Sequence, residues 1–322
     1  MSSPVLFSVY VNELFGILNS SGLGCKVAGQ FLGCLGYADD LLLLSASISG
    51  LQAMVTLCER FAVSRGLKFS TNVIIEKSKT KCIAFTSNKK KLSELSPVKL
   101  NGDPLPWVES IKHLGNVLEA DNSMKKDCSI KRATFIGKLN SLIQEFYFAA
   151  PEVIVKIVNI YATSFYGSGL WDLYSADCDR LYKAWNVCIR IVFKLDRKAH
   201  RYLIEPMSET LHPKVMLASR YVSFWGALKS SSKVCVRILA SLNQYDQRTV
   251  FGRTLKKIGN DCRLAMEELS AVKVKQLMHY FPTPDAEIWR IGILKELTDD
   301  KMQIAGFSMD ELDHIKQFLC VS

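Results

Sequence analysis

The sequence lacks any apolar run of about 18 residues, the length that a membrane-spanning helix requires. It also lacks a basic N-terminal segment followed by an apolar one, which is the pattern of a secretory signal peptide. The ten cysteines include no Cys-x-x-Cys pair and no close Cys/His group, so no zinc site is indicated. We therefore expect an intracellular protein that does not span a membrane, and we do not choose between nucleus and cytoplasm. In such a reducing compartment the cysteines are expected to be small core residues.

Internal repeats and low-complexity tracts are missing as well, and an apolar fraction of 48% with 22% charged residues excludes general disorder. At 322 residues the chain is long enough for two or three core-forming units. The net charge of +10 is uneven, because residues 285–322 hold eight acids and four bases, so residues 1–284 carry +14. A basic surface of this size suits polyphosphate partners such as nucleic acid, although many soluble proteins are basic without binding any.

Two adjacent acids, Asp39 and Asp40, lie between two short apolar runs, residues 31–35 and 41–44. Runs of this length predict strands, so the pattern predicts a hairpin with both carboxylates at its tip. Because burying two neighbouring anions among leucines is costly, the acids must lie at an open edge, gain hydrogen-bond donors or bind a cation. Hard carboxylate oxygens suit Mg²⁺, which takes one or two carboxylates together with waters and substrate phosphates. An ordinary Asp-Asp turn is the alternative interpretation.

The residues around this pair resemble the reverse transcriptases of non-LTR (LINE-type) retrotransposons. Tyr37-Ala38-Asp39-Asp40 is similar to the catalytic box of these enzymes, and residues 3–14, which begin Ser3-Pro4, are similar to the block that contacts template and nucleotide. Further matches, in the family's order, are a later palm block at 66–69 and 77–81, a primer-grip hairpin at 111–115 and a segment after the first thumb helices at 166–171. The resemblance covers about residues 1–200, and four ordered motifs are more specific than the acidic pair alone.

The resemblance implies RNA-directed DNA polymerase activity by two-metal nucleotidyl transfer, with an RNA template, a DNA primer and deoxynucleoside triphosphates as partners. Asp39, and more loosely Asp40, would be the catalytic ligands of Mg²⁺. The resemblance also implies contacts to the nucleotide from Ser3, Pro4, Tyr37 and Lys79, and a primer grip at His113, Leu114 and Gly115.

Two of these assignments carry alternatives. Which of Lys77, Lys79 and Lys81 matches the family position stays open, because the link at 71–76 is longer than usual; we take Lys79. A solvated basic loop explains any one of these lysines equally well. His113 stands where an aromatic residue is usual, and we assign it no proton-transfer role.

The chain also departs from the family. In these polymerases a third carboxylate comes from an earlier palm strand, whereas this chain begins at Met1-Ser2-Ser3-Pro4, so that acid, the fingers and any nuclease domain have no counterpart here. We expect the back half of such an enzyme, inactive as an isolated fragment, with an upstream polymerase half as a partner. A catalytically dead nucleic-acid-binding remnant and a co-opted interaction protein are the alternatives.

The expected fold is α+β. We expect a partial polymerase palm, an antiparallel sheet with helices, over 1–120, an all-helical thumb-like domain over 121–201, and a helical region over 202–322. Periodicity predicts helices over 4–18, with Ser3 as N-cap, and over 51–62, with a capping box at Ser49–Gln52 and an end at Gly66. Asn101-Gly102 predicts a hairpin. Later helices are predicted over 130–143, 151–161 and 181–195.

Five basic residues crowd the first helix of the predicted thumb: Lys125, Lys126, Lys131, Arg132 and Lys138. On a thumb such a face would lie along the duplex backbone, where phosphate contacts give affinity without sequence preference. A charged outer face of a core helix explains them equally well. Residues 285–322, the acidic end, predict a small helix pair and indicate no function.

Overall fold

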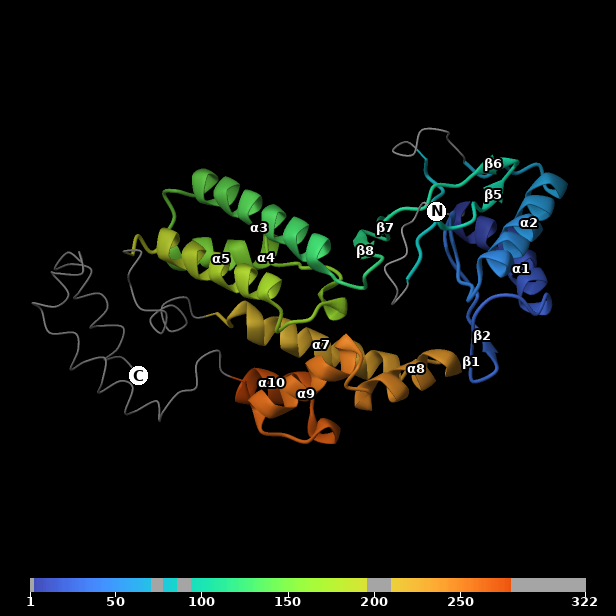
Figure 1. Ribbon diagram of the computed structural model, residues 1–322. Helices are drawn as coiled ribbons and strands as arrows, with labels where there is room; N and C mark the ends of the chain where they lie inside the picture. The colour runs from blue at the N-terminus through green and yellow to red at the C-terminus, as the bar shows by residue number, and fades with distance from the viewer. Residues whose placement is uncertain (1–2, 71–77, 86–93, 196–209, 279–322) are drawn as a thin grey trace, which may run out of the picture. The chain divides into compact units, whose positions relative to one another are not determined.

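The computed structural model describes residues 3–70, 78–85, 94–195 and 210–278, with side chains from Val9 onward (Figure 1). The chain divides into two compact units. The first unit comprises Met1–Met124 and Ala227–Tyr245, and the second comprises Lys125–Gly226 and Asp246–Ser322. The fold is α+β, with helices and small two-stranded antiparallel sheets, as the composition and periodicity predict. The three domain ranges expected from the sequence stay a prediction.

The N-terminal part of the first unit contains two helices, α1 (Ser3–Ser20) and α2 (Ile48–Ser64). Both were predicted, and α1 begins at Ser3 itself rather than after it. The predicted capping box at Ser49–Gln52 is wrong, because Ser47 is the N-cap and its Oγ accepts from the Gly50 N–H at 3.1 Å. The Gln52 side chain instead pairs with the backbone of Lys99, accepting its N–H at 2.6 Å and donating to its carbonyl at 2.9 Å. Gly66 follows the end of α2 with a left-handed φ of 65°, as expected.

Four antiparallel hairpins follow the same plan of two short strands joined by a two-residue loop. They are β1 (Lys26–Val27) with β2 (Gln30–Phe31), β3 (Cys34–Tyr37) with β4 (Asp40–Leu43), β5 (Lys99–Leu100) with β6 (Asp103–Pro104), and β7 (Ser110–His113) with β8 (Asn116–Glu119). At Asn101-Gly102 both φ values are positive, 53° and 85°, which is the backbone that this turn sequence favours. Within the described ranges each strand pairs only inside its own hairpin, so a continuous palm sheet stays a prediction.

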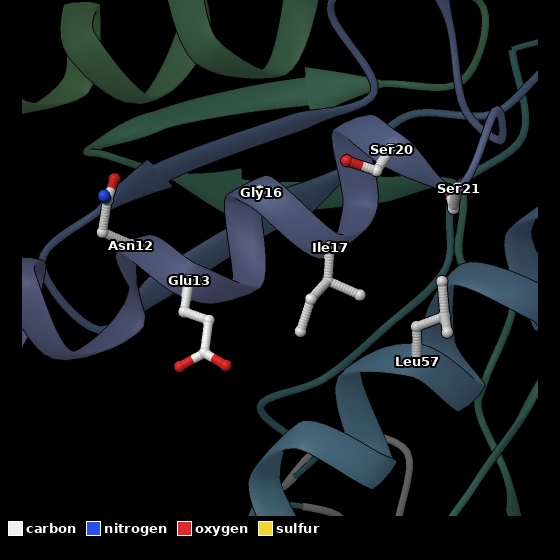
Figure 2. Close-up of a pocket in the computed structure, with 7 residues that line it drawn as sticks. All are labelled: Asn12, Glu13, Gly16, Ile17, Ser20, Ser21 and Leu57. Carbon is white, nitrogen blue, oxygen red and sulfur yellow. The ribbon is translucent and has the colours of Figure 1, made fainter.

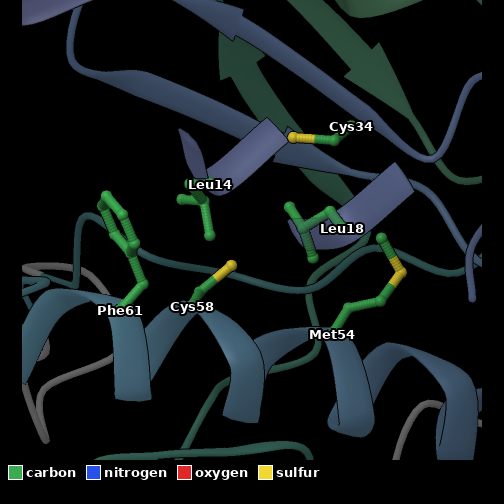
Figure 3. Packing of buried hydrophobic residues seen from close by; sticks show 6 residues of the cluster. All are labelled: Leu14, Leu18, Cys34, Met54, Cys58 and Phe61. Atoms are coloured by element: carbon green, nitrogen blue, oxygen red, sulfur yellow. The ribbon is translucent and has the colours of Figure 1, made fainter. Parts of the chain in front are cut away.

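The core of the first unit lies between α1, α2 and the β3–β4 hairpin (Figure 3). Each fully buried Leu or Met in such a cluster contributes about 1.5–3 kcal/mol to stability. A second cluster packs against α2 around Val55 and Val98. Helix α8 (Val234–Tyr245) also belongs to this unit and contacts β1 and β2. The buried side chains of the first cluster are Leu14, Leu18, Cys34, Met54, Cys58 and Phe61.

The second unit is helical. Its helices are α3 (Lys125–Glu145), α4 (Pro151–Tyr161), α5 (Ala176–Val192), α7 (Pro213–Lys229), α9 (Val250–Cys262) and α10 (Ala271–Leu277), with short 3₁₀ turns at Ser168–Leu170 and Met266–Glu268. The end of α7, after Gly226, is assigned to the first unit. The helix predicted from residue 181 begins five residues earlier, because Ser175 caps it by accepting the Cys178 N–H. No helix in the described ranges is both long and apolar enough to cross a membrane.

Aromatic rings fill the interior where α3 and α5 meet. Phe135 lies 5.7 Å from Phe165 and 6.0 Å from Trp185, ring centre to ring centre, and Phe165 lies 6.4 Å from Trp171. Asp127 of α3 is 2% exposed and accepts a 2.8 Å hydrogen bond from the indole N–H of Trp171. A buried carboxylate needs such a donor, so this acid has a structural partner that the sequence did not indicate.

Candidate metal site and nucleic-acid interface

The two acids lie at the tip of the β3–β4 hairpin, as the sequence predicts. Asp39 is in the two-residue loop, and Asp40 begins β4 directly opposite Tyr37. Both acids are exposed, and the Tyr37 side chain is 66% exposed. Ala38 adopts a left-handed φ of 50°, which costs a residue other than glycine about 1–2 kcal/mol. The first loop residue of each of the other three hairpins also has a positive φ, so this backbone belongs to the tight turn and does not by itself mark a site.

Close packing anchors the base of this hairpin. Gly36 faces α1 so closely that a Cβ there would lie 2.4 Å from Cζ of Phe15, so only glycine fits without a shift of the ring. Cys34 is buried, and Leu41 and Leu43 pack against the first core cluster. The hairpin therefore has a fixed base and an exposed acidic tip.

The acidic pair fits a loosely held divalent cation. Neither carboxylate makes a hydrogen bond or an ion pair with another residue in the described ranges. In the same ranges, no three His, Cys, Asp or Glu side chains come together as a metal-binding group. Mg²⁺ needs only one or two carboxylates when waters and substrate phosphates complete its shell. Asp39 and Asp40 match that requirement.

The predicted nucleotide contacts are described only in part. Ser3 and Pro4 form the first turn of α1, and their side chains lie outside the described residues, as does Lys77. Lys79 is exposed and follows the buried Ser78. The hydroxyl of the next residue, Thr80, donates to the Ser70 carbonyl at 2.8 Å. Within the described ranges the Lys79 side chain makes no hydrogen bond or ion pair with Asp39 or Asp40.

The predicted primer-grip residues form the loop of the β7–β8 hairpin. His113 pairs with Asn116, and Leu114 and Gly115 have φ values of 45° and 78° between them. His113 is half-buried, whereas Leu114 and Gly115 are exposed. The tight turn expected from the sequence is confirmed, and its role in holding a primer stays a prediction.

The five basic residues on α3 do not share one face. At 100° per residue, Lys125 and Arg132 lie on one side of the helix, and Lys131 and Lys138 lie about 120° away from them. The Lys131 ammonium lies 5.6 Å from the centre of the Tyr166 ring, and the Lys138 ammonium donates to the Tyr161 carbonyl at 3.1 Å. Lys131 and Lys138 therefore have intramolecular roles, and Lys125 and Arg132 are the better candidates for phosphate contacts.

A shallow groove of about 700 Å³ between α1 and α2 was not indicated by the sequence (Figure 2). At 100° per residue, Glu13, Ile17 and Ser20 lie about 140–160° around α1 from Phe15, the residue that faces the acidic hairpin. This part of the groove is therefore turned away from that hairpin. Its one ionisable residue, Glu13, pairs with Arg65, whose guanidinium stacks on the rings of Tyr10 and Phe61. The groove offers no group for catalysis. Its lining is Asn12, Glu13, Gly16, Ile17, Ser20, Ser21 and Leu57.

No protein-family model matches the chain, and no curated protein matches its sequence significantly.

Proposed function

We propose that the chain is the palm and thumb part of an RNA-directed DNA polymerase, with Asp39 and, more loosely, Asp40 as the ligands of Mg²⁺. The observation that carries the proposal is the β3–β4 hairpin. Its base is packed on α1 through Gly36, and its tip exposes two carboxylates beside Tyr37 that pair with no residue in the described part of the chain. A fixed base with an exposed acidic tip is what a site needs if it is to meet a large polyphosphate substrate.

In this proposal each part of the first unit has one task. Bound Mg²⁺ would neutralise phosphate charge and favour ionisation of the primer 3′-hydroxyl. Asp39 and Asp40 hold the cation, and the exposed Tyr37 ring lies next to the nucleotide. The loop at Leu114-Gly115 supports the end of the primer, and an RNA template with its DNA primer and deoxynucleoside triphosphates are the substrates.

Metal binding at the acidic tip can be measured without turnover. We expect Mn²⁺, used as a paramagnetic substitute for Mg²⁺, to broaden the NMR signals of Tyr37 and Leu41 in the full chain. The Mn²⁺ affinity obtained from this broadening should fall at least about tenfold in Asp39→Asn. Asp103 offers a matched control, because it is an exposed acid that follows the two-residue loop of the β5–β6 hairpin, as Asp40 follows that of β3–β4.

Asp103→Asn should leave the broadening around Tyr37 unchanged. Equal broadening in the wild-type chain and in Asp39→Asn would reject the metal site.

Binding of nucleic acid without catalysis is the second candidate function. It is favoured by the charge of +14 on residues 1–284 and by the side of α3 that carries Lys125 and Arg132. A co-opted interaction protein has no comparable feature in its favour.

A further inference from the structure

The second unit contains a hollow that has no part in the proposed polymerase site. It has a volume of about 390 Å³ and lies between α4, α7 and α10. Pockets for small molecules usually have between about 300 and 1,000 Å³. The hollow therefore has the size of a binding site for a small molecule.

Arg220 of α7 lines the wall as an exposed residue whose guanidinium is held by hydrogen bonds. One guanidinium nitrogen, Nη1, donates to two backbone carbonyls, those of Thr163 at 2.9 Å and Ser164 at 2.8 Å. An arginine has five N–H donors, and in the described part of the chain those on Nε and Nη2 make no hydrogen bond. Two carbonyl contacts fix the plane of the guanidinium, and no carboxylate in the described ranges pairs with it.

The environment of Arg220 favours an anion. Partial burial lowers the pKa of its guanidinium, which means that the charged form has lost part of its hydration. A cation in this situation gains free energy when an anion replaces the lost water. The backbone carbonyls satisfy one nitrogen and carry no full negative charge, so they do not replace an anionic partner.

A second cation faces the same hollow from another element. Lys275 belongs to α10, which is tied to α7 by the hydrogen bond from the Ser219 hydroxyl to the Ala271 carbonyl at 3.0 Å. Ser223 of α7 and Asn159 of α4 add neutral polar groups to the lining. None of the residues that line the hollow in the described part of the chain is acidic. Two cations and several hydrogen-bonding groups thus converge where no acid compensates them.

We propose that this hollow binds the phosphate group of a small phosphate monoester, held by Arg220 and Lys275, with the rest of the molecule against Met216 and Leu211. A monoester carries close to two negative charges and three terminal oxygens, which matches two cations. A phosphodiester carries one charge and has two terminal oxygens. Arginine binds phosphate through two parallel hydrogen bonds, and lysine acts as a point charge. This site does not depend on the proposed polymerase function.

Binding of phenyl phosphate and inorganic phosphate to the full chain tests this site, with dimethyl phosphate as the diester probe. We expect phenyl phosphate and inorganic phosphate both to bind in calorimetric titrations, phenyl phosphate more tightly because its ring contacts Met216. Dimethyl phosphate should bind at least about tenfold more weakly than phenyl phosphate. Arg220→Gln and Lys275→Gln should each weaken phenyl phosphate binding about tenfold or more, the loss expected for one charge-assisted hydrogen bond.

Lys273→Gln is the matched control, because Lys273 is an exposed lysine of the same helix and does not line the hollow. It should leave the affinity unchanged. Since Arg220→Gln also breaks two hydrogen bonds to the backbone, its thermal stability is measured alongside, and Lys275→Gln decides the result if Arg220→Gln fails to fold.

No binding of phenyl phosphate at about 10 mM and low ionic strength would overturn the proposal. Equal losses in Lys273→Gln and Lys275→Gln would also overturn it, because they would indicate attraction by general charge. Equal affinity for dimethyl phosphate would reject the monoester assignment.

Discussion

His212 is a buried histidine at the start of α7, 1% exposed, with its ring 5.6 Å from that of Tyr182. Its Nδ1 accepts the Lys214 N–H at 3.2 Å, so the proton of the neutral ring is on Nε2. Burial, followed by the positive charge of Lys214, lowers the pKa of His212 from 6.5 to about 3. The folded chain therefore keeps this ring neutral at pH values where an unfolded chain protonates it.

This difference predicts a loss of stability in mild acid. Well above pH 6.5 the ring is neutral in both states. As the pH falls through 6.5 the unfolded state binds the proton first, so the free energy of unfolding decreases. Between pH 6.5 and pH 5 we expect a loss of about 1.6 kcal/mol from this residue. Urea denaturation followed by tryptophan fluorescence measures it, since Trp171, Trp185 and Trp225 all belong to the second unit.

His212→Asn separates this titration from other acid effects. Asparagine keeps an acceptor for the Lys214 N–H and does not titrate, so the variant should be less stable at pH 7 but lose less stability between pH 6.5 and pH 5. The same pH slope in both proteins would contradict the assignment to His212.

Some residues of the candidate site could be predicted from sequence and others could not, for a physical reason. Asp39 and Asp40 were found because their neighbours along the chain form the strands that expose them. Arg220 could not be found in this way, because its partners Thr163 and Ser164 lie more than fifty residues away. The pairing of Asp127 with Trp171, 44 residues apart, escaped for the same reason.

Helix α3 carries the prediction for nucleic-acid binding. We expect the full chain to bind primer–template duplex without sequence preference, and each phosphate contact adds about 0.9 to the magnitude of the log–log salt slope on B-form DNA. Lys125→Ala with Arg132→Ala should therefore reduce that slope by up to about 2. Fluorescence anisotropy at salt concentrations from about 50 to 200 mM measures it.

Lys138→Ala is the control, because its ammonium is bonded to the Tyr161 carbonyl at the end of α4. It should change stability and leave the slope nearly unchanged. A flat slope for the unaltered chain would mean that the +14 of residues 1–284 is dispersed surface charge.

Elements defined by neighbouring residues were predicted well. The hairpin at Asn101-Gly102 follows from its turn residues, and α4 begins at Pro151 as expected. The predicted N-terminal cap of α2 was wrong, because Ser47 and not Ser49 is its N-cap. Gln52, the expected second half of the capping box, binds the Lys99 backbone 47 residues away. The pairing of strands across separate hairpins has no local signal, and the palm sheet expected from the resemblance stays a prediction.

At the level of the entire chain, we expect no primer extension by the isolated protein. Among the described residues no third acid joins Asp39 and Asp40, so the two carboxylates should hold the metals loosely. Misplacement of reacting groups costs on the order of a hundredfold in rate. Purified chain is incubated with a primed RNA template, Mg²⁺ and deoxynucleoside triphosphates, and products are resolved by length. Template-dependent incorporation that disappears in Asp39→Asn would contradict the expectation.

The contact of α8 with β1 and β2 has a consequence for the order of events during synthesis. The first unit is discontinuous: the chain leaves it after Met124 and returns at Ala227, and α8 ends at Tyr245. At about 5–20 residues per second, the ribosome needs roughly 6–24 s to make residues 125–245, from the end of the first segment to the end of α8. Until α8 has been made, the β1–β2 hairpin cannot form its contacts with this helix. The first unit therefore completes its packing only after α3 to α7 have been synthesised.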